Sequence, residues 1–195
     1  MAIDEIFSKV CAHMRKGLML HDQIATAFSF LNLYGYQKCH EYHFYEESVN
    51  YRCLQNFYLN TYHKLIPEQE IKYTNLIPTN WYKYARENVD TNTKRSAVKD
   101  LFKQWVEWEK QTKTELQSFY KQALDLGEIC AAENILYFLK DVSEELRIAQ
   151  EIYIGLDNMN YDIIHIIEEQ DSYFSIFTKK IKKLYKDGEH NDKIT

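Results

Sequence analysis

Glu109 is the residue of this chain whose position most strongly suggests chemistry. It interrupts an apolar helical stripe whose members recur every three or four positions. The stripe consists of Leu101, Trp105, Trp108, Thr112, Leu116, Phe119, Ala123 and Leu126. An ionised carboxylate on a buried face is costly unless it is paired, hydrogen-bonded or bound to a metal ion. Glu109 is therefore the first candidate for a site residue.

Two histidines, His40 and His43, stand three residues apart, a spacing that allows both to share one face of a helix. The spacing is not that of the H-E-x-x-H zinc motif. One interpretation places both rings at the boundary between core and solvent, beside many tyrosines. The other makes His43 a metal ligand, because Glu47 follows it at i+4 on the same face.

Residues that break helices are rare in this chain, so long helices must position these side chains. The 195 residues include only 5 Gly and 2 Pro, and the two prolines bracket one short segment. The apolar spacing predicts five helices, over residues 4–34, 37–65, 97–126, 128–155 and 161–185. Gly35 and Gly127 are expected to close the helices that precede them with positive φ, and Ser96 is a plausible N-cap.

Two helical hairpins joined by one long connection, residues 66–96, predict a four-helix bundle with a crossover, followed by a C-terminal fifth helix. The alternative is an up-down bundle with a disordered loop. The apolar side chains of Leu76, Ile77, Trp81 and Tyr84 favour a connection that packs against the bundle. The length of the chain fits a single helical domain over residues 1–195.

These segments resemble the ferritin-like superfamily, and ferritins most closely, over about Met14 to Leu156. The segment WVEWEK places Glu109 where the third helix of that family carries a metal carboxylate. The segment HFYEESVNYRCL is similar to the second helix, in which Glu47 takes the place of the bridging glutamate. The resemblance implies an all-α bundle with iron or manganese held by carboxylates in its core.

The ligand set departs from the family pattern in three helices. Asn50 stands where Glu-x-x-His has its histidine. Counting back from a hinge at Gly35 brings His21 or Asp22 opposite Glu47. The fourth helix offers only Ser143 on the stripe through Leu136 and Leu139, with Glu144 and Glu145 beside it.

The candidate ligands are thus Glu47, Glu109, His43, His21 and Asp22, and ferroxidase activity is doubtful because ligands are missing. The expected function is a ferritin-like protein with an iron or manganese carboxylate site in the bundle core. The alternative is a non-catalytic helical scaffold that associates with itself or with a protein partner.

Composition excludes several other classes. A net charge of -5 argues against nucleic-acid binding, and no apolar run reaches the ~18 residues of a membrane helix. The sequence has no Gly-rich phosphate loop and no signal-peptide pattern at its start. Cys11, Cys39, Cys53 and Cys130 form no CxxC pair, so we expect four reduced core thiols in a cytoplasmic homo-oligomer.

Overall fold

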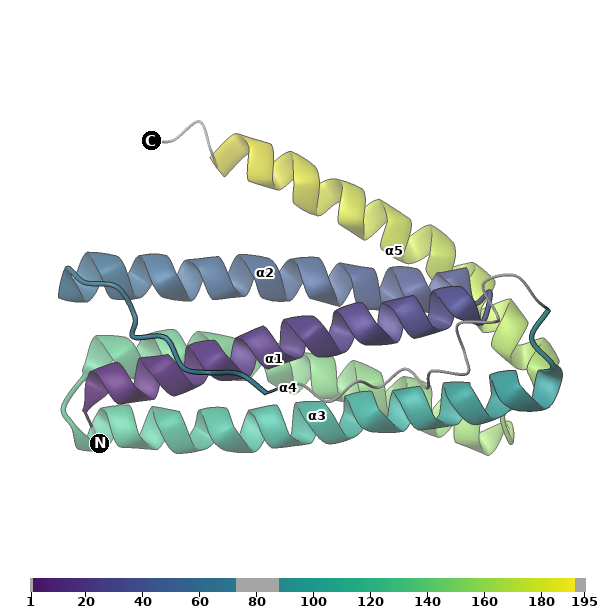
Figure 1. Cartoon of the computed structure of the whole chain (residues 1–195), viewed down its shortest axis with the longest axis horizontal. Coiled ribbons are helices and arrows are strands. Elements are labelled where there is room, and N and C mark those ends of the chain that lie inside the picture. The colour runs from purple at the N-terminus through teal and green to yellow at the C-terminus, as the bar shows by residue number, and fades with distance from the viewer. Residues whose placement is uncertain (1, 73–87, 192–195) are drawn as a thin grey trace.

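A computed structural model describes residues 2–72 and 88–191 of the chain, with side chains as far as residue 184. Five helices and no strand occur in these ranges (Figure 1). The helices are α1 (Ile3–Phe30), α2 (Tyr34–Tyr62), α3 (Thr91–Asp125), α4 (Ile129–Asn158) and α5 (Ile163–Asn191). The all-α class predicted from the sequence is therefore confirmed.

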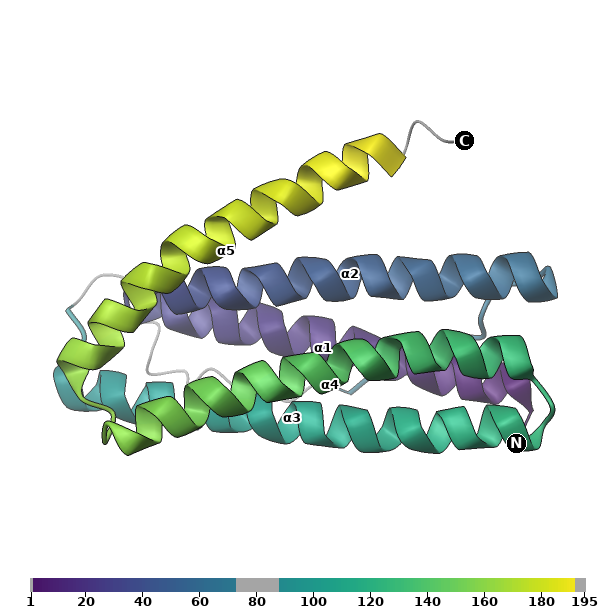
Figure 2. The same cartoon turned by 180° about the vertical axis from the view of Figure 1, so that it is seen from behind.

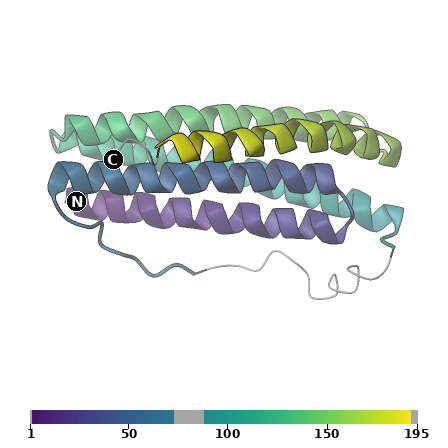
Figure 3. The same ribbon diagram turned by 90° about the horizontal axis from the view of Figure 1, so that it is seen from above.

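The helices form two antiparallel hairpins, α1 with α2 and α3 with α4, which lie against one another as two layers (Figure 3). Helices α2 and α3 run in the same direction, so the end of α2 and the start of α3 lie at opposite ends of the bundle (Figure 2). This is the predicted crossover connectivity. The hydroxyl of Ser8 donates to the carbonyl of Pro67 at 2.6 Å and holds the start of the connection against α1. Leu76, Ile77, Trp81 and Tyr84 lie outside the described residues.

The turn between α3 and α4 closes at Gly127, as predicted, with φ +75°. The amide of Glu128 donates to the carbonyl of Ala123 at 3.0 Å, which is the long hydrogen bond of a Schellman turn. Glycine adopts this left-handed conformation without steric cost.

The turn between α1 and α2 uses Asn32 rather than Gly35. Asn32 has φ 57°, and the amide of Leu33 donates to the carbonyl of Phe28 at 3.0 Å. Gly35 lies in the first turn of α2, so the prediction of positive φ there is wrong. Its role is close packing instead: a Cβ at Gly35 would fall on the backbone carbonyl of Gln170 in α5.

Helix α3 begins earlier than the apolar pattern indicated. Asp90 is its N-cap and accepts a hydrogen bond from the amide of Thr93 at 2.9 Å. Ser96, predicted as the cap, is an exposed residue inside the helix. The first turn is polar and carries no apolar periodicity, so its capping hydrogen bond rather than burial defines the helix start.

A layer of buried polar side chains divides the bundle core into two apolar clusters. One cluster includes Phe28, Phe102 and Leu156, and the other includes Phe7, Leu116 and Ile135. Along each bundle helix, the polar positions other than His13 fall between the stretches that contribute to the two clusters. This polar layer consists of His13, His21, His40, His43, Glu47, Glu109, Thr112 and Glu145.

Helix α5 packs on the first half of α2 and then diverges from the bundle (Figures 1 and 2). The hydroxyl of Tyr36 donates to Glu169 at 2.5 Å, and the Gly35 amide donates to the side chain of Gln170 at 2.8 Å. Phe177 is buried, and its ring centroid lies 6.2 Å from that of His43. Helix α5 therefore covers one side of the polar layer.

All four cysteines are free, but only Cys11 and Cys39 are buried. Cys53 and Cys130 are exposed, so the expectation of four core thiols is wrong for these two. Both face solvent from helices whose apolar stripes run on the opposite side. Among the described helices, none combines the length and the hydropathy that crossing a membrane requires.

Candidate metal centre

Every bundle helix contributes a titratable side chain to the polar layer. Helix α1 supplies His21, α3 supplies Glu109, α4 supplies Glu145, and α2 supplies His40, His43 and Glu47. Helical spacing explains the α2 contribution, because positions 40, 43 and 47 follow the three- and four-residue steps of one helix face. With His13, also on α1, seven ionisable groups therefore meet inside one bundle.

Three imidazoles gather around the indole of Trp105. The ring centroids of His40 and His43 lie 4.7 and 5.0 Å from it, and that of His21 lies 6.0 Å away. The Nδ1 atoms of His21 and His40 are 3.0 Å apart, so one donates to the other. Burial lowers the pKa of His21 and of His40 well below 6.5, and lowers that of His43 to about 4. All three rings are therefore neutral at neutral pH, and each keeps a nitrogen lone pair.

Three carboxyl groups share the same buried space. Burial is the main cause that raises the pKa values of Glu47, Glu109 and Glu145 well above their ordinary range. Their mutual repulsion adds to it: Glu145 raises the pKa of Glu47, while Glu145 and Glu47 raise that of Glu109. Glu47 thus lies near enough to Glu109 to raise its pKa, and Glu145 affects the pKa values of both. Like charges this close cannot all ionise unless a cation compensates them.

The imidazoles and the carboxyl groups touch one another. His43 Nδ1 lies 3.2 Å from Glu145 Oε1 and 3.6 Å from Glu46 Oε2, and His21 Nε2 lies 3.7 Å from Glu109 Oε1. Potential ligand atoms of His43, Glu46 and Glu145 all lie within 4.8 Å of one another. The site therefore holds mixed nitrogen and oxygen donors at distances that one cation could bridge after small side-chain adjustments.

Several of these buried polar atoms lack a hydrogen-bond partner among the described residues. They are Glu109 Oε2 and the Nε2 atoms of His21, His40 and His43. The other oxygen of Glu109 accepts from the Trp105 indole at 3.1 Å. A buried polar atom without a partner costs about 1–3 kcal/mol, so four in one layer indicate a missing interaction. Their donor types, imidazole nitrogen and carboxylate oxygen, fit a transition-metal ion.

The side of α1 that faces Glu47 carries Gly17. A Cβ at Gly17 would lie 3.1 Å from Glu47 Oε1, so the glycine makes room for this carboxyl. His21 lies one turn further along and approaches Glu109 instead. Asp22 is exposed, which removes it from the candidate ligands.

Helix α4 contributes Glu145, which the sequence interpretation placed beside the site. The core face of α4 runs through Phe138, Val142, Glu145 and Ala149. Ser143, the predicted core position, is half-buried and donates to the carbonyl of Leu139 at 2.7 Å. The sequence does indicate Glu145, because it follows Val142 by three residues on one helix face. The adjacent stripe through Leu136 and Leu139 is also apolar, however, and it points to Ser143 instead.

Asn50, which replaces the expected histidine, is already engaged. Its side-chain amide donates to Asp141 at 2.7 Å. His40, which the sequence interpretation places at the boundary between core and solvent, is fully buried and lies beside His21. The histidines of this site, His21, His40 and His43, are therefore not the histidine of a Glu-x-x-His motif.

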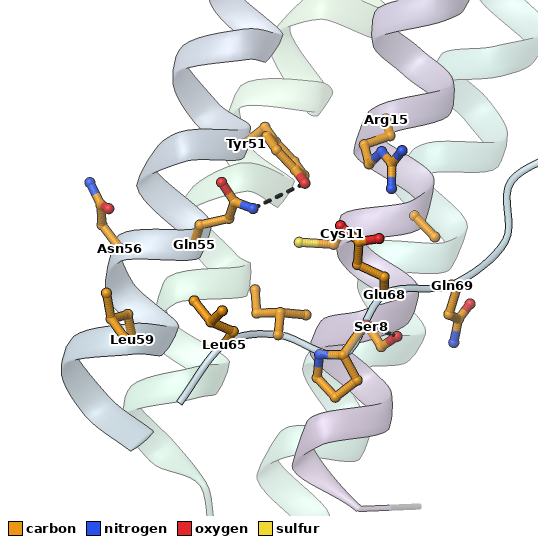
Figure 4. A pocket seen from close by; sticks show the side chains of 13 residues that line it. Ser8, Cys11, Arg15, Tyr51, Gln55, Asn56, Leu59, Leu65, Glu68 and Gln69 are labelled. Atoms are coloured by element: carbon orange, nitrogen blue, oxygen red, sulfur yellow. Dashed lines mark hydrogen bonds between the residues drawn. The ribbon is translucent and has the colours of Figure 1, made fainter. Parts of the chain in front are cut away.

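One pocket in the described part of the chain is separate from the polar layer. It has a volume of about 400 Å³ and lies between α1, α2 and residues 65–69 (Figure 4). Cys11, Arg15, Tyr51 and Glu68 line it, and none of the three core carboxyls does. This pocket therefore does not open onto the core carboxyls.

Comparison with known proteins identifies the fold and nothing finer. No protein-family model matches the sequence, and no curated protein matches it. Among solved structures, a humanized archaeal ferritin superposes with a TM-score of 0.72 at 14% identity, covering 89% of this chain and 97% of that one. An open pore ferritin from the hyperthermophilic archaeon Archaeoglobus fulgidus superposes with a TM-score of 0.71 at 12% identity, covering 88% and 95%. The chain therefore has the ferritin-like fold.

Proposed function

We propose that this protein binds a divalent transition-metal ion, iron or manganese, in the polar layer of its bundle core. The ligands would come from Glu47, Glu109 and Glu145, with His21 and His43 as nitrogen donors. The observation that carries the proposal is the group of buried nitrogen and oxygen atoms without hydrogen-bond partners on Glu109, His21 and His43. A cation would compensate the three carboxylates and occupy those atoms in one step.

The donor set favours iron and manganese over the alkaline-earth ions Mg²⁺ and Ca²⁺. Carboxylate oxygens favour hard cations, and imidazoles favour transition metals, so a mixed set suits Fe(II) and Mn(II) better than Mg²⁺ or Ca²⁺. A bound ion of this kind would supply a redox-active centre. Ferroxidase activity lies outside the proposal, because the family histidine is replaced by Asn50, whose amide is bound to Asp141.

Metal content tests the proposal. Protein produced with iron or manganese in the medium is expected to retain the ion through purification, as measured by plasma mass spectrometry. A Glu47→Gln, Glu109→Gln variant should lose most of it, because two charged ligands become neutral amides. The matched control, Glu107→Gln with Glu144→Gln, changes two exposed acids on α3 and α4 and should keep the metal. Equal metal content in all three proteins would contradict the proposal.

A second candidate function is self-association through α5. Ile164, Ile167 and Phe174 are 65%, 43% and 46% exposed and share one face of this helix. We propose that this face pairs with a second copy of the chain. Sedimentation should then show a smaller species for Phe174→Ser than for the wild type, whereas the exposed control Ser175→Ala should leave the size unchanged. A wild-type monomer would contradict the proposal.

We also propose a cytoplasmic location. The four cysteines are free, and two of them are exposed, which fits a compartment that keeps thiols reduced.

A further inference from the structure

His13 is a buried imidazole outside the candidate ligand set, and both of its nitrogens have partners. Nδ1 lies 2.8 Å from Glu115 Oε2, and Nε2 lies 2.7 Å from Thr112 Oγ1. The ring stacks on the indole of Trp108 with centroids 4.5 Å apart and planes 6° apart. The side chain of Glu115 is 36% exposed, while His13 is 5% exposed. A hydrogen-bonded path therefore leads from the solvent to Thr112.

The path supports two protonation states of His13 without losing a hydrogen bond. In the neutral ring, Nδ1–H donates to Glu115, and the hydroxyl of Thr112 donates to Nε2. In the protonated ring, both nitrogens donate, and the Thr112 hydroxyl turns to the carbonyl of Trp108, which it reaches at 2.9 Å. One rotation of a hydroxyl thus accompanies the gain of a proton.

The inner end of this path opens on a small cavity beside the candidate metal centre. The cavity has a volume of about 20 Å³ and is lined by His13 and Thr112 on one side and by Glu47 and Glu145 on the other. A polar cavity needs roughly 10–15 Å³ to hold a water molecule, so this one has room for one. A single water would connect Thr112 to the carboxyl groups.

We propose that His13, with Thr112 and Glu115, carries protons between the buried carboxyl groups and the solvent when a metal ion enters or leaves the core. This inference rests on the proposed metal site. Metal binding displaces ligand protons, and protons displaced from buried carboxyl groups need a path to solvent. His13 is the positioned group that supplies one.

A proton displaced from Glu47 or Glu145 passes to the cavity water, which releases another to Thr112 Oγ1. The Thr112 hydroxyl proton passes to His13 Nε2, and the Nδ1 proton passes to Glu115 and then to solvent. No electron is transferred, and the reverse sequence returns a proton when the metal leaves.

The charged groups around His13 act in opposite directions on its protonation. Burial lowers its pKa most, the facing carboxylate of Glu115 on α3 raises it, and Lys16 on α1 lowers it. Across the cavity lie Glu47 on α2 and Asp141 and Glu145 on α4. The group that would accept the proton on the solvent side, Glu115, is thus also the one that stabilises the charged ring.

The test is the rate at which protons leave when Mn²⁺ binds. Metal-free protein is mixed with Mn²⁺ in a stopped-flow instrument with a pH indicator dye. The variants Thr112→Val and Glu115→Gln are expected to release as many protons as the wild type, at least roughly tenfold more slowly. In His13→Ala, added imidazole should restore part of the lost rate. Thr114→Val and Glu107→Gln change exposed residues of the same helix and should behave as the wild type.

The outcomes separate the relay from the metal site. Equilibrium Mn²⁺ affinity, measured by calorimetry, should be nearly the same in the wild type and in Thr112→Val. Unchanged affinity with an unchanged rate of proton release would overturn the relay and leave the metal site standing. Absence of Mn²⁺ binding by the wild-type protein would overturn both.

Discussion

Replacing Gly35 with alanine is expected to release α5 from the start of α2 and to lower the free energy of unfolding by about 3 kcal/mol, the upper part of the usual range for overpacking. The added Cβ would meet the backbone carbonyl of Gln170, which cannot rotate away as a side chain could. The hydrogen bonds of the Gly35 amide and of Tyr36 to α5 would be strained together with it. Urea unfolding and hydrogen exchange of residues 163–184 would measure both effects.

Gly155 provides the matched control for this substitution. It lies inside α4, and a Cβ there would have no neighbour within 4 Å. Gly155→Ala is therefore expected to be neutral or to stabilise the protein by about 0.5–1 kcal/mol. If Gly35→Ala behaved like Gly155→Ala, α5 would not lie against α2 as described.

The metal-free protein is expected to be most stable at weakly acidic pH and to lose stability on both sides. Above 4.5, the ordinary pKa of a glutamate, the unfolded chain releases protons that folded Glu47, Glu109 and Glu145 still hold. Stability therefore falls as the pH rises, until the raised pKa values of the folded state are passed. Each such group contributes a slope of at most about 1.4 kcal/mol per pH unit.

The histidines have the opposite effect. Below 6.5, the unfolded chain binds protons that buried His21, His40 and His43 cannot bind, because burial lowers their pKa values. Stability therefore falls as the pH drops from 6.5, and for His43 the loss is complete near its folded pKa of about 4. Between pH 4.5 and 6.5 the effects of the glutamates and the histidines on stability oppose one another. We therefore expect a plateau in the free energy of unfolding over this range.

The Glu109→Gln variant separates the contribution of the buried glutamates to the pH dependence of stability from that of the histidines. The amide keeps an oxygen for the Trp105 indole and removes an ionisable group from the buried cluster. At pH 8 the metal-free variant is expected to be more stable than the metal-free wild type by more than about 1 kcal/mol, because one raised pKa no longer opposes folding. The exposed control Glu107→Gln should leave the pH profile unchanged. A Glu109→Gln variant that is less stable at pH 8 would show that the carboxylate is already compensated.

The positions of the helices could be read from the sequence more reliably than their registers. Apolar spacing located the bundle helices and the turn at Gly127. A shift of one residue turns a helix by 100°, so a stripe through Leu139 and Ser143, one residue beyond the core positions Phe138 and Val142, leaves Glu145 to the side on α4. Apolar periodicity alone does not distinguish two neighbouring stripes that both contain leucine.

The first hinge illustrates how a small error grows across a hairpin. Counting from Gly35 placed Asp22 and His21 opposite Glu47. The turn closes at Asn32 instead, and Glu47 lies as far after Asn32 as Gly17 lies before it. The same count pairs His43 with His21, whose ring centroids are 5.4 Å apart. In an antiparallel pair, an error in the position of the hinge residue shifts the predicted partner on the other helix by twice as many residues. The residues of α1 that face the site could therefore be identified only from the structure.

Anomalous diffraction from a crystal grown with Mn²⁺ tests the central claim most directly, because it locates the ion as well as detecting it. The account predicts a manganese peak inside the polar layer, in contact with Glu109 and Glu145 and with at least one of His21 and His43. The peak should disappear in Glu47→Gln, Glu109→Gln crystals grown under the same conditions. A map with manganese only at surface carboxylates, and none among these buried side chains, would contradict the account.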